Sequence, residues 1–138
     1  MIFVDSNVLL DIVTADETWL AWSLDQLSDA LSRGGIITDD IVYAETSVRV
    51  PTMGELDGLY ARFEIELAAI PRSALFLAGK AFGRYRNAGG SRSSILPDFL
   101  IGAHAATLGV PLLTRDTRRY RSYFPQLELI APAMPGIG

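Results

Sequence analysis

Cysteine is absent from this chain of 138 residues, and histidine occurs once, at His104. Without thiols, the chain can form neither a disulfide framework nor a thiolate metal site. A single imidazole also argues against a zinc site of the usual histidine-rich kind. Any metal ion that this protein binds should therefore be a hard cation held by oxygen ligands, such as magnesium, manganese or calcium.

Long apolar runs are missing as well. The longest uncharged stretch, between Asp98 and Arg115, is shorter than the ~18 residues that a membrane span needs, and it contains Gly109 and Pro111. Near the start of the chain, Asp5 interrupts the apolar run and no basic region precedes it, so no secretion signal is visible. We therefore expect a soluble cytoplasmic protein with no membrane segment.

Lysine is nearly absent, because 11 of the 12 basic residues are arginine and Lys80 is the exception. The net charge of −4 conceals an asymmetry: residues 1–72 carry 13 acidic and 4 basic side chains, whereas residues 73–138 carry 3 acidic and 8 basic ones. This asymmetry is either ordinary solvated surface charge or a basic surface in the second half. Arginine suits the latter, because it pairs with phosphate or carboxylate through two hydrogen bonds.

Two apolar runs each end at an acidic residue. The run from Met1 to Val4 is typical of a buried strand and leads directly into Asp5. The run from Val110 to Thr114 leads in a similar way to Asp116. If these strands are neighbours in a parallel sheet, both acids lie beyond the carboxyl ends of strands, where such sheets place functional groups.

The rest of the chain alternates short strands with helices. Further strands are predicted at residues 36–38, 67–70 and 127–130. Helices are predicted at residues 8–13, 16–33, 41–47, 51–67, 73–87 and 97–108, with a turn or helix at 117–124 and a flexible loop at 88–94. Ser6 or Asn7 should cap the first helix. This alternation predicts one α/β domain over residues 1–132, followed by a flexible tail at residues 133–138.

Four acidic residues lie at positions where an acidic side chain is unexpected, at strand ends or within apolar helices: Asp5, Glu45, Asp98 and Asp116. Taken singly, each has a structural explanation: Asp98 could be a helix N-terminal charge, Asp116 a turn residue, and Glu45 the partner of an arginine. Taken together, several carboxylates in a small volume need either raised pKa values or a cation between them. Magnesium is bound through carboxylates and water. Two such ions ~4 Å apart can orient a water for attack on a phosphodiester and stabilise the leaving oxygen.

The stretches that contain these acids resemble the PIN-domain family, and in particular the VapC-type toxins of bacterial toxin–antitoxin pairs. The resemblance covers Met1 to about Pro132 and rests on residues 1–10, Glu45, residues 97–105 and residues 113–116. It implies a three-layer α/β/α sandwich around a central, mainly parallel sheet of four to five strands. It also implies the toxin of a type II pair, an endoribonuclease dependent on Mg²⁺ or Mn²⁺ that cuts tRNA or rRNA.

Carried over by position, the resemblance implies roles for individual residues. The metal site would consist of Asp5, Glu45, Asp98 and Asp116, while Ser6, Asn7 and Thr114 match polar residues that support such a site. The resemblance further implies a homodimer, a cognate VapB-like antitoxin that inhibits it, and a larger assembly with that antitoxin.

The basic second half fits an RNA substrate. We predict that the phosphate contacts include Arg86, Arg92, Arg115, Arg118 and Arg119, with Tyr120 or Tyr123 available for base stacking. His104 lies in an alanine-rich helix and is predicted to be packed rather than catalytic. Trp19 and Trp22 belong either to the core or to a dimer or antitoxin surface.

Other functions stay open on the sequence. A housekeeping RNA-processing nuclease of the same fold, or a catalytically inactive module that binds RNA or a partner, would share most of these features. A phosphatase with an aspartyl nucleophile, or a phospho-receiver domain, would want a second acid near Asp5 and a lysine in the site. Position 7 is instead Asn7, and Lys80 is the single lysine. The retention of four acids favours an active nuclease, with water attacking the phosphodiester.

Overall fold

A computed structural model describes residues 1–92 and 96–133 and shows a sheet of five parallel strands. In chain order the strands are β1 (Ile2–Val4), β2 (Ile36–Asp39), β3 (Ile65–Ala68), β4 (Leu112–Leu113) and β5 (Leu129–Ile130). Their order across the sheet is β3-β2-β1-β4-β5, and each neighbouring pair is parallel. The predicted α/β architecture with a central parallel sheet is confirmed.

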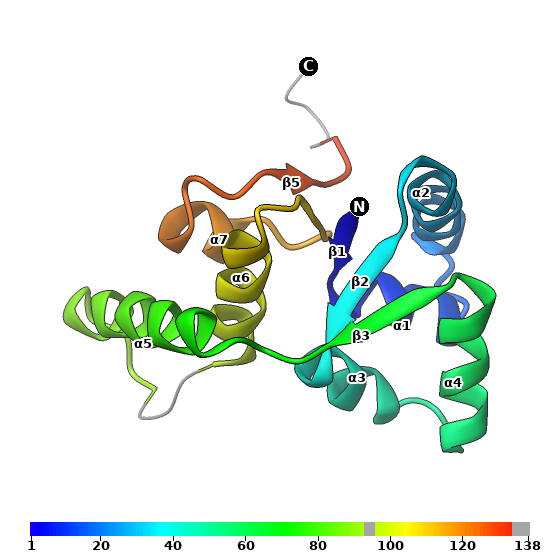
Figure 1. Ribbon diagram of the computed structural model, residues 1–138, viewed down its shortest axis with the longest axis horizontal. Helices are drawn as coiled ribbons and strands as arrows, with labels where there is room; N and C mark the ends of the chain where they lie inside the picture. Colours follow the sequence, from blue (N-terminus) through cyan, green and yellow to red (C-terminus); the bar gives the residue numbers. More distant parts are fainter. Residues whose placement is uncertain (93–95, 134–138) are drawn as a thin grey trace.

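Seven helices of the described residues surround this sheet: α1 (Ser6–Val13), α2 (Leu20–Arg33), α3 (Asp40–Ser47), α4 (Met53–Arg62), α5 (Arg72–Asn87), α6 (Pro97–Leu108) and α7 (Arg118–Tyr123). Figure 1 shows α5, α6 and α7 on one side of the sheet and α1, α2 and α4 on the other, which gives three layers. The central strands are buried on both faces, since all four residues of β2 are buried, and both Phe3 and Val4 in β1 are fully buried.

The strand pairing places β1 and β4, the two strands that lead to Asp5 and Asp116, next to each other. Phe3 of β1 pairs with Ile37 of β2 on one side and with Leu112 of β4 on the other. The ladder continues one residue further, because the backbone N–H of Asp5 donates to the carbonyl oxygen of Leu113 over 3.0 Å. The first and fourth strands are therefore neighbours, as the sequence predicts.

Three predicted element boundaries are wrong: the end of the helix predicted at residues 51–67, the position of the third strand and the start of the second helix. The strand predicted at residues 67–70 is β3 at Ile65–Ala68, because α4 ends at Arg62 and Glu64 reverses the chain with a φ of 50°. The helix predicted from residue 16 begins at Leu20. Asp16 instead forms a turn, in which its Oδ1 accepts the backbone N–H groups of Thr18 and Trp19, each over 2.9 Å.

The cap of the first helix also differs from the prediction. Asp5 itself, in an extended conformation, is the N-cap of α1, and its side chain accepts the backbone N–H of Ser6. The helix begins at Ser6, so neither Ser6 nor Asn7 caps it. Parts of two further predictions, the loop at residues 88–94 and the tail at residues 133–138, fall outside the described residues. Within the described ranges, no helix combines the length and apolar character needed to span a membrane.

Candidate active site

Asp5 lies at the centre of a buried hydrogen-bond network at the carboxyl end of β1. Its side chain is 4 % exposed, and its Oδ2 accepts hydroxyl hydrogen bonds from Thr114 over 2.8 Å and from Tyr120 over 2.9 Å. Its Oδ1 accepts the backbone N–H of Ser6 over 2.8 Å. Burial raises the pKa of Asp5 to about 6, although the hydrogen bonds it accepts act in the opposite direction.

Tyr120 is the residue of this network that the sequence did not assign to it. The side chain is 1 % exposed, and burial, together with the charges of Asp5 and Asp98, raises its pKa well above 10. Its hydroxyl therefore stays protonated and donates to Asp5. The predicted base-stacking role of Tyr120 is wrong, because a ring enclosed by protein has no face open to a nucleobase. Tyr123 is half-buried, and its predicted role stays a prediction.

Thr114 and Asn7 connect the ends of β1 and β4. The buried Thr114 hydroxyl donates its one proton to Asp5 and accepts hydrogen bonds from Asn7 Nδ2 over 3.1 Å and from the backbone N–H of Asp116 over 3.1 Å. Asn7 Oδ1 in turn accepts the backbone N–H of Arg115 over 3.1 Å. The polar residues singled out from the sequence thus lie against Asp5 and shape the turn that contains Asp116.

Glu45 reaches the same region from α3, which starts directly at the carboxyl end of β2. Its Oε1 accepts the hydroxyl of Ser6 over 2.9 Å. Burial raises the pKa of Glu45, the Ser6 hydrogen bond lowers it, and the charges of Asp98 and Asp39 raise it further. Ser6 therefore connects Glu45 to the end of β1.

Asp98 lies in the first turn of α6, behind Pro97, and is held by an ion pair. Its Oδ2 is 3.0 Å from Nη1 of Arg119, and both side chains are about one-third exposed. Burial raises the pKa of Asp98 and the charge of Asp116 raises it further, whereas Arg119 lowers it. The Arg119 guanidinium also lies 5.6 Å from the ring centre of Tyr85, which fixes its orientation.

The four carboxylates singled out from the sequence lie at the same end of the sheet. Asp98 raises the pKa values of both Asp5 and Glu45, and Asp116 raises that of Asp98, so the side chains are close enough to repel one another. Asp116 is exposed. Repelling carboxylates with no cysteine ligand fit a hard divalent cation by their donor chemistry.

The spacing of these acids is looser than that of a ready-made metal site. Among the residues that the structure describes, no three acidic or histidine side chains are gathered into a group that could hold a metal ion. Asp98 is engaged by Arg119, and Glu45 by Ser6. The role of the four acids as metal ligands therefore stays a prediction that the donor chemistry supports.

The predicted RNA-binding arginines lie in different environments. Arg115 forms a two-point ion pair with the buried Asp11, over 2.7 and 2.8 Å, and lies 5.1 Å from the ring centre of Trp19. Arg119 pairs with Asp98, as described above. Arg86, Arg92 and Arg118 are exposed. The exposure of the latter three makes them accessible to a ligand, whereas Arg115 is anchored beside the site.

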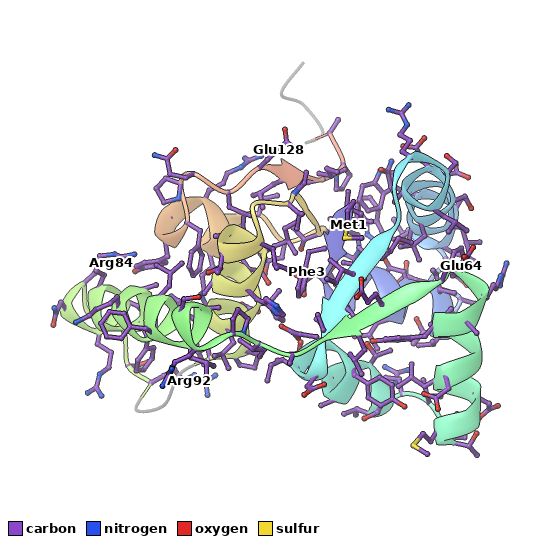
Figure 2. The ribbon with its side chains drawn as sticks, viewed as in Figure 1. Met1, Phe3, Glu64, Arg84, Arg92 and Glu128 are labelled. Carbon is purple, nitrogen blue, oxygen red and sulfur yellow. The ribbon has the colours of Figure 1, made fainter. Side chains whose placement is uncertain are left out.

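Basic side chains of the second half lie beside α5 and border the cavity next to Asp116. Figure 2 shows Arg84 and Arg92 beside α5 and Glu64 at the far side, next to α4. Between α5 and α7, a cavity of about 410 Å³ is lined by Tyr85, Tyr123 and Ser122, together with Asp116, Arg118 and Arg119. Arginine, tyrosine and hydroxyl side chains therefore border Asp116 directly.

His104 lies in the buried core, whereas the two tryptophans are only partly enclosed by protein. His104 is fully buried, as predicted, with its Nδ1 2.9 Å from Oδ2 of Asp39 and its ring 5.1 Å from that of Phe3. Trp19 and Trp22 are half-buried and lie edge to face with their ring centres 6.0 Å apart. Asp39 also caps α3, and its contact with His104 joins residues 65 apart in the chain.

Comparison with known proteins agrees with the fold. The sequence profile of the PIN domain matches residues 2–125. None of the curated protein sequences matches the chain significantly.

Three solved structures show the same fold at low sequence identity. VapBC2 from Rickettsia felis, bound to a DNA fragment from their promoter, contains a chain that is 18 % identical, with a TM-score of 0.73 and coverage of 96 % of this chain and 100 % of that chain. A chain of VapBC-1 from nontypeable Haemophilus influenzae is 17 % identical, with a TM-score of 0.69 and coverage of 95 % of this chain and 98 % of that chain. A chain of a toxin–antitoxin complex from Klebsiella pneumoniae is 16 % identical, with a TM-score of 0.67 and coverage of 96 % of this chain and 98 % of that chain.

Proposed function

Because the chain belongs to the PIN domain family, we propose that it is a Mg²⁺- or Mn²⁺-dependent endoribonuclease and the toxin of a type II toxin–antitoxin pair. One observation carries the proposal. Asp5, Glu45, Asp98 and Asp116 come from four separate segments, reach the same end of the sheet, and three of them have raised pKa values. Membership of a family of nucleases supports hydrolysis as the reaction.

In the proposed reaction, water attacks the phosphorus of an RNA phosphodiester and the bond to the leaving oxygen breaks. The four carboxylates would hold the cation, which when bound supplies a water of lowered pKa and stabilises developing negative charge. Ser6 keeps Glu45 at the site through its 2.9 Å hydrogen bond. The acids alone would repel RNA, so binding must come from the basic residues around them.

Arginine side chains beside the acids can supply that binding. Arg118 and Arg119 line the same cavity as Asp116, together with Tyr85 and Tyr123. Arginine binds phosphate oxygens in a bidentate manner, and tyrosine can stack on an unpaired base. Arg86 and Arg92, at and beyond the end of α5, would extend the contact to neighbouring phosphates. The arrangement therefore favours a single-stranded or looped RNA segment, as tRNA and rRNA contain.

The experiment is cleavage of a mixed tRNA and rRNA pool by the wild-type protein in Mg²⁺, by the same protein in EDTA, and by Asp5→Asn and Asp98→Asn. Removing one carboxylate from a cation site costs several kcal/mol of transition-state stabilisation, so we expect cleavage to fall by about 10³-fold. The matched control is Asp25→Asn, an exposed acid on α2, which should cleave like the wild type. Cleavage that survives both site substitutions or EDTA would refute the proposal.

The partner proposed is a VapB-like antitoxin, with a homodimer of this chain as the core of a larger complex. The support is that similar solved structures are of VapBC proteins and of a toxin–antitoxin complex. Sedimentation of the purified chain, alone and with the product of an adjacent small gene, should show a dimer and then a larger, inactive assembly. A chain that stays monomeric and does not bind that product would favour the housekeeping nuclease.

An inactive binding module is a second candidate, and one contact favours it. Arg119 already neutralises Asp98, and the described acids do not form a ready-made cation site. RNA binding without cleavage in Mg²⁺ or Mn²⁺, by folded protein, would decide for this alternative.

A further inference from the structure

The two oxygens of Asp5 face different neighbours. Oδ2 lies 2.8 Å from the hydroxyl of Thr114 and 2.9 Å from the hydroxyl of Tyr120. Oδ1 lies 2.8 Å from the backbone nitrogen of Ser6 and 3.5 Å from its hydroxyl oxygen, which is itself 2.9 Å from Glu45. Oδ1 is therefore the oxygen on the side of Glu45, and Oδ2 is the oxygen on the side of α7.

The hydrogen-bonding capacity of the two oxygens is used unequally. A carboxylate oxygen offers about two lone-pair positions. The hydroxyl groups of Thr114 and Tyr120 fill both lone-pair positions of Oδ2. The amide nitrogen Nδ2 of Asn7 also lies 3.5 Å from Oδ2. Oδ1 accepts one short hydrogen bond, since the single proton of the Ser6 hydroxyl is directed at Glu45 over the shorter distance. Oδ1 thus keeps a lone pair for a ligand.

We propose that Tyr120 is a positioning residue for Asp5: together with Thr114, its hydroxyl fixes Oδ2, so that Asp5 presents Oδ1 to a cation. The inference rests on the proposed function and adds a residue that no sequence motif pointed to. The ring that delivers the hydroxyl is itself firmly placed, because Tyr120 is 1 % exposed.

Gly102 of α6 provides the space for this placement. A Cβ atom at Gly102 would lie 3.0 Å from the ring of Tyr120 and 2.6 Å from that of Phe124, so α7 can dock this closely against α6 because residue 102 has no side chain. The hydroxyl of Tyr120 therefore reaches Asp5 through rigid packing, and its hydrogen bond constrains the carboxylate more than a solvent-exposed donor could.

The test compares Tyr120→Phe with the control Tyr60→Phe, which removes the hydroxyl of another buried tyrosine, on α4. Binding of Mn²⁺ is measured by electron paramagnetic resonance on folded protein, and RNA cleavage is measured over a range of Mn²⁺ concentrations. Loss of a group that orients a metal ligand typically weakens affinity by about 10–100-fold. We expect about a tenfold weaker Mn²⁺ affinity for Tyr120→Phe, cleavage recovered at high Mn²⁺, and wild-type behaviour for Tyr60→Phe.

A purely structural role of Tyr120 would lower the melting temperature and leave Mn²⁺ affinity of the folded protein unchanged, and that result would overturn the inference. Thr114→Val is the second variant: it removes the other hydroxyl donor to Oδ2 while the Tyr120 ring stays in place, and it should also weaken Mn²⁺ binding. Failure of the wild-type protein to bind Mn²⁺ or cut RNA would overturn the proposed function together with the inference. Normal wild-type binding with unaffected variants would overturn the inference alone.

Discussion

Asp5 and Asp39 occupy equivalent places at the ends of neighbouring strands, yet their surroundings differ. Each is buried and caps the next helix; Asp5 directly follows β1, and Asp39 is the last residue of β2. Both oxygens of Asp39 are bound by groups of the chain: Oδ1 by the backbone N–H groups of Ile41 and Val42, and Oδ2 by His104. Asp5 keeps one oxygen partly open and faces other carboxylates. Partners, rather than position, separate the structural acid from the candidate catalytic one.

The largest expected effect that tests this comparison is the loss of stability when Asp39 is replaced. Asp39→Ala removes a helix cap and the buried partner of His104, which together should lower the free energy of unfolding by about 2–5 kcal/mol. Urea denaturation measures this change. Cleavage of RNA per folded molecule should stay within about tenfold of wild type at a temperature well below the transition. Loss of cleavage as complete as in Asp5→Asn would remove the distinction between the two acids.

The second effect is on the pH dependence of stability, measured in EDTA. Because burial raises the pKa of Asp5 from 3.8 to about 6, the folded protein binds this proton more tightly than the unfolded chain does. The resulting stabilisation is fully present below about pH 3.8 and is lost as the pH rises through about 6, a change of roughly 2–3 kcal/mol. Asp5→Asn should lack this part of the profile, whereas equal slopes for the two proteins would contradict the environment described for Asp5.

The smallest effect concerns Arg119, which neutralises Asp98 and borders the cavity between α5 and α7. Arg119→Gln should weaken RNA binding about fivefold. It should also reduce the slope of log affinity against log salt concentration by about one, since one phosphate contact is lost. The control is Arg33→Gln, whose exposed arginine pairs with Asp29 in α2. Fluorescence anisotropy with labelled RNA measures both. Equal effects of the two substitutions would mean that Arg119 acts only as a counter-ion of Asp98.

Much of the fold followed from local pattern. Short apolar runs predicted β1, β2 and β4, and the acids at the ends of β1 and β4 pointed to one edge of the sheet because parallel strands share a carboxyl end. Proline at position 97 and glycine at position 109 marked the limits of α6. The boundary errors at α2 and β3 arose where single side-chain or backbone events, the Asp16 turn and the reversal at Glu64, overrode periodicity.

The sequence by itself determined which acids are available and which elements carry them, because helix and strand periodicity depend on neighbouring residues. The tertiary structure decided what each acid does. The contact of Tyr120 with Asp5 joins residues 115 apart, and that of Arg115 with Asp11 joins residues 104 apart. Both depend on the way α7 and the turn after β4 pack against the sheet. The segment from Arg118 to Arg121 is basic and aromatic in sequence, and only its docking buries Tyr120 beside a carboxylate while Arg118 stays exposed.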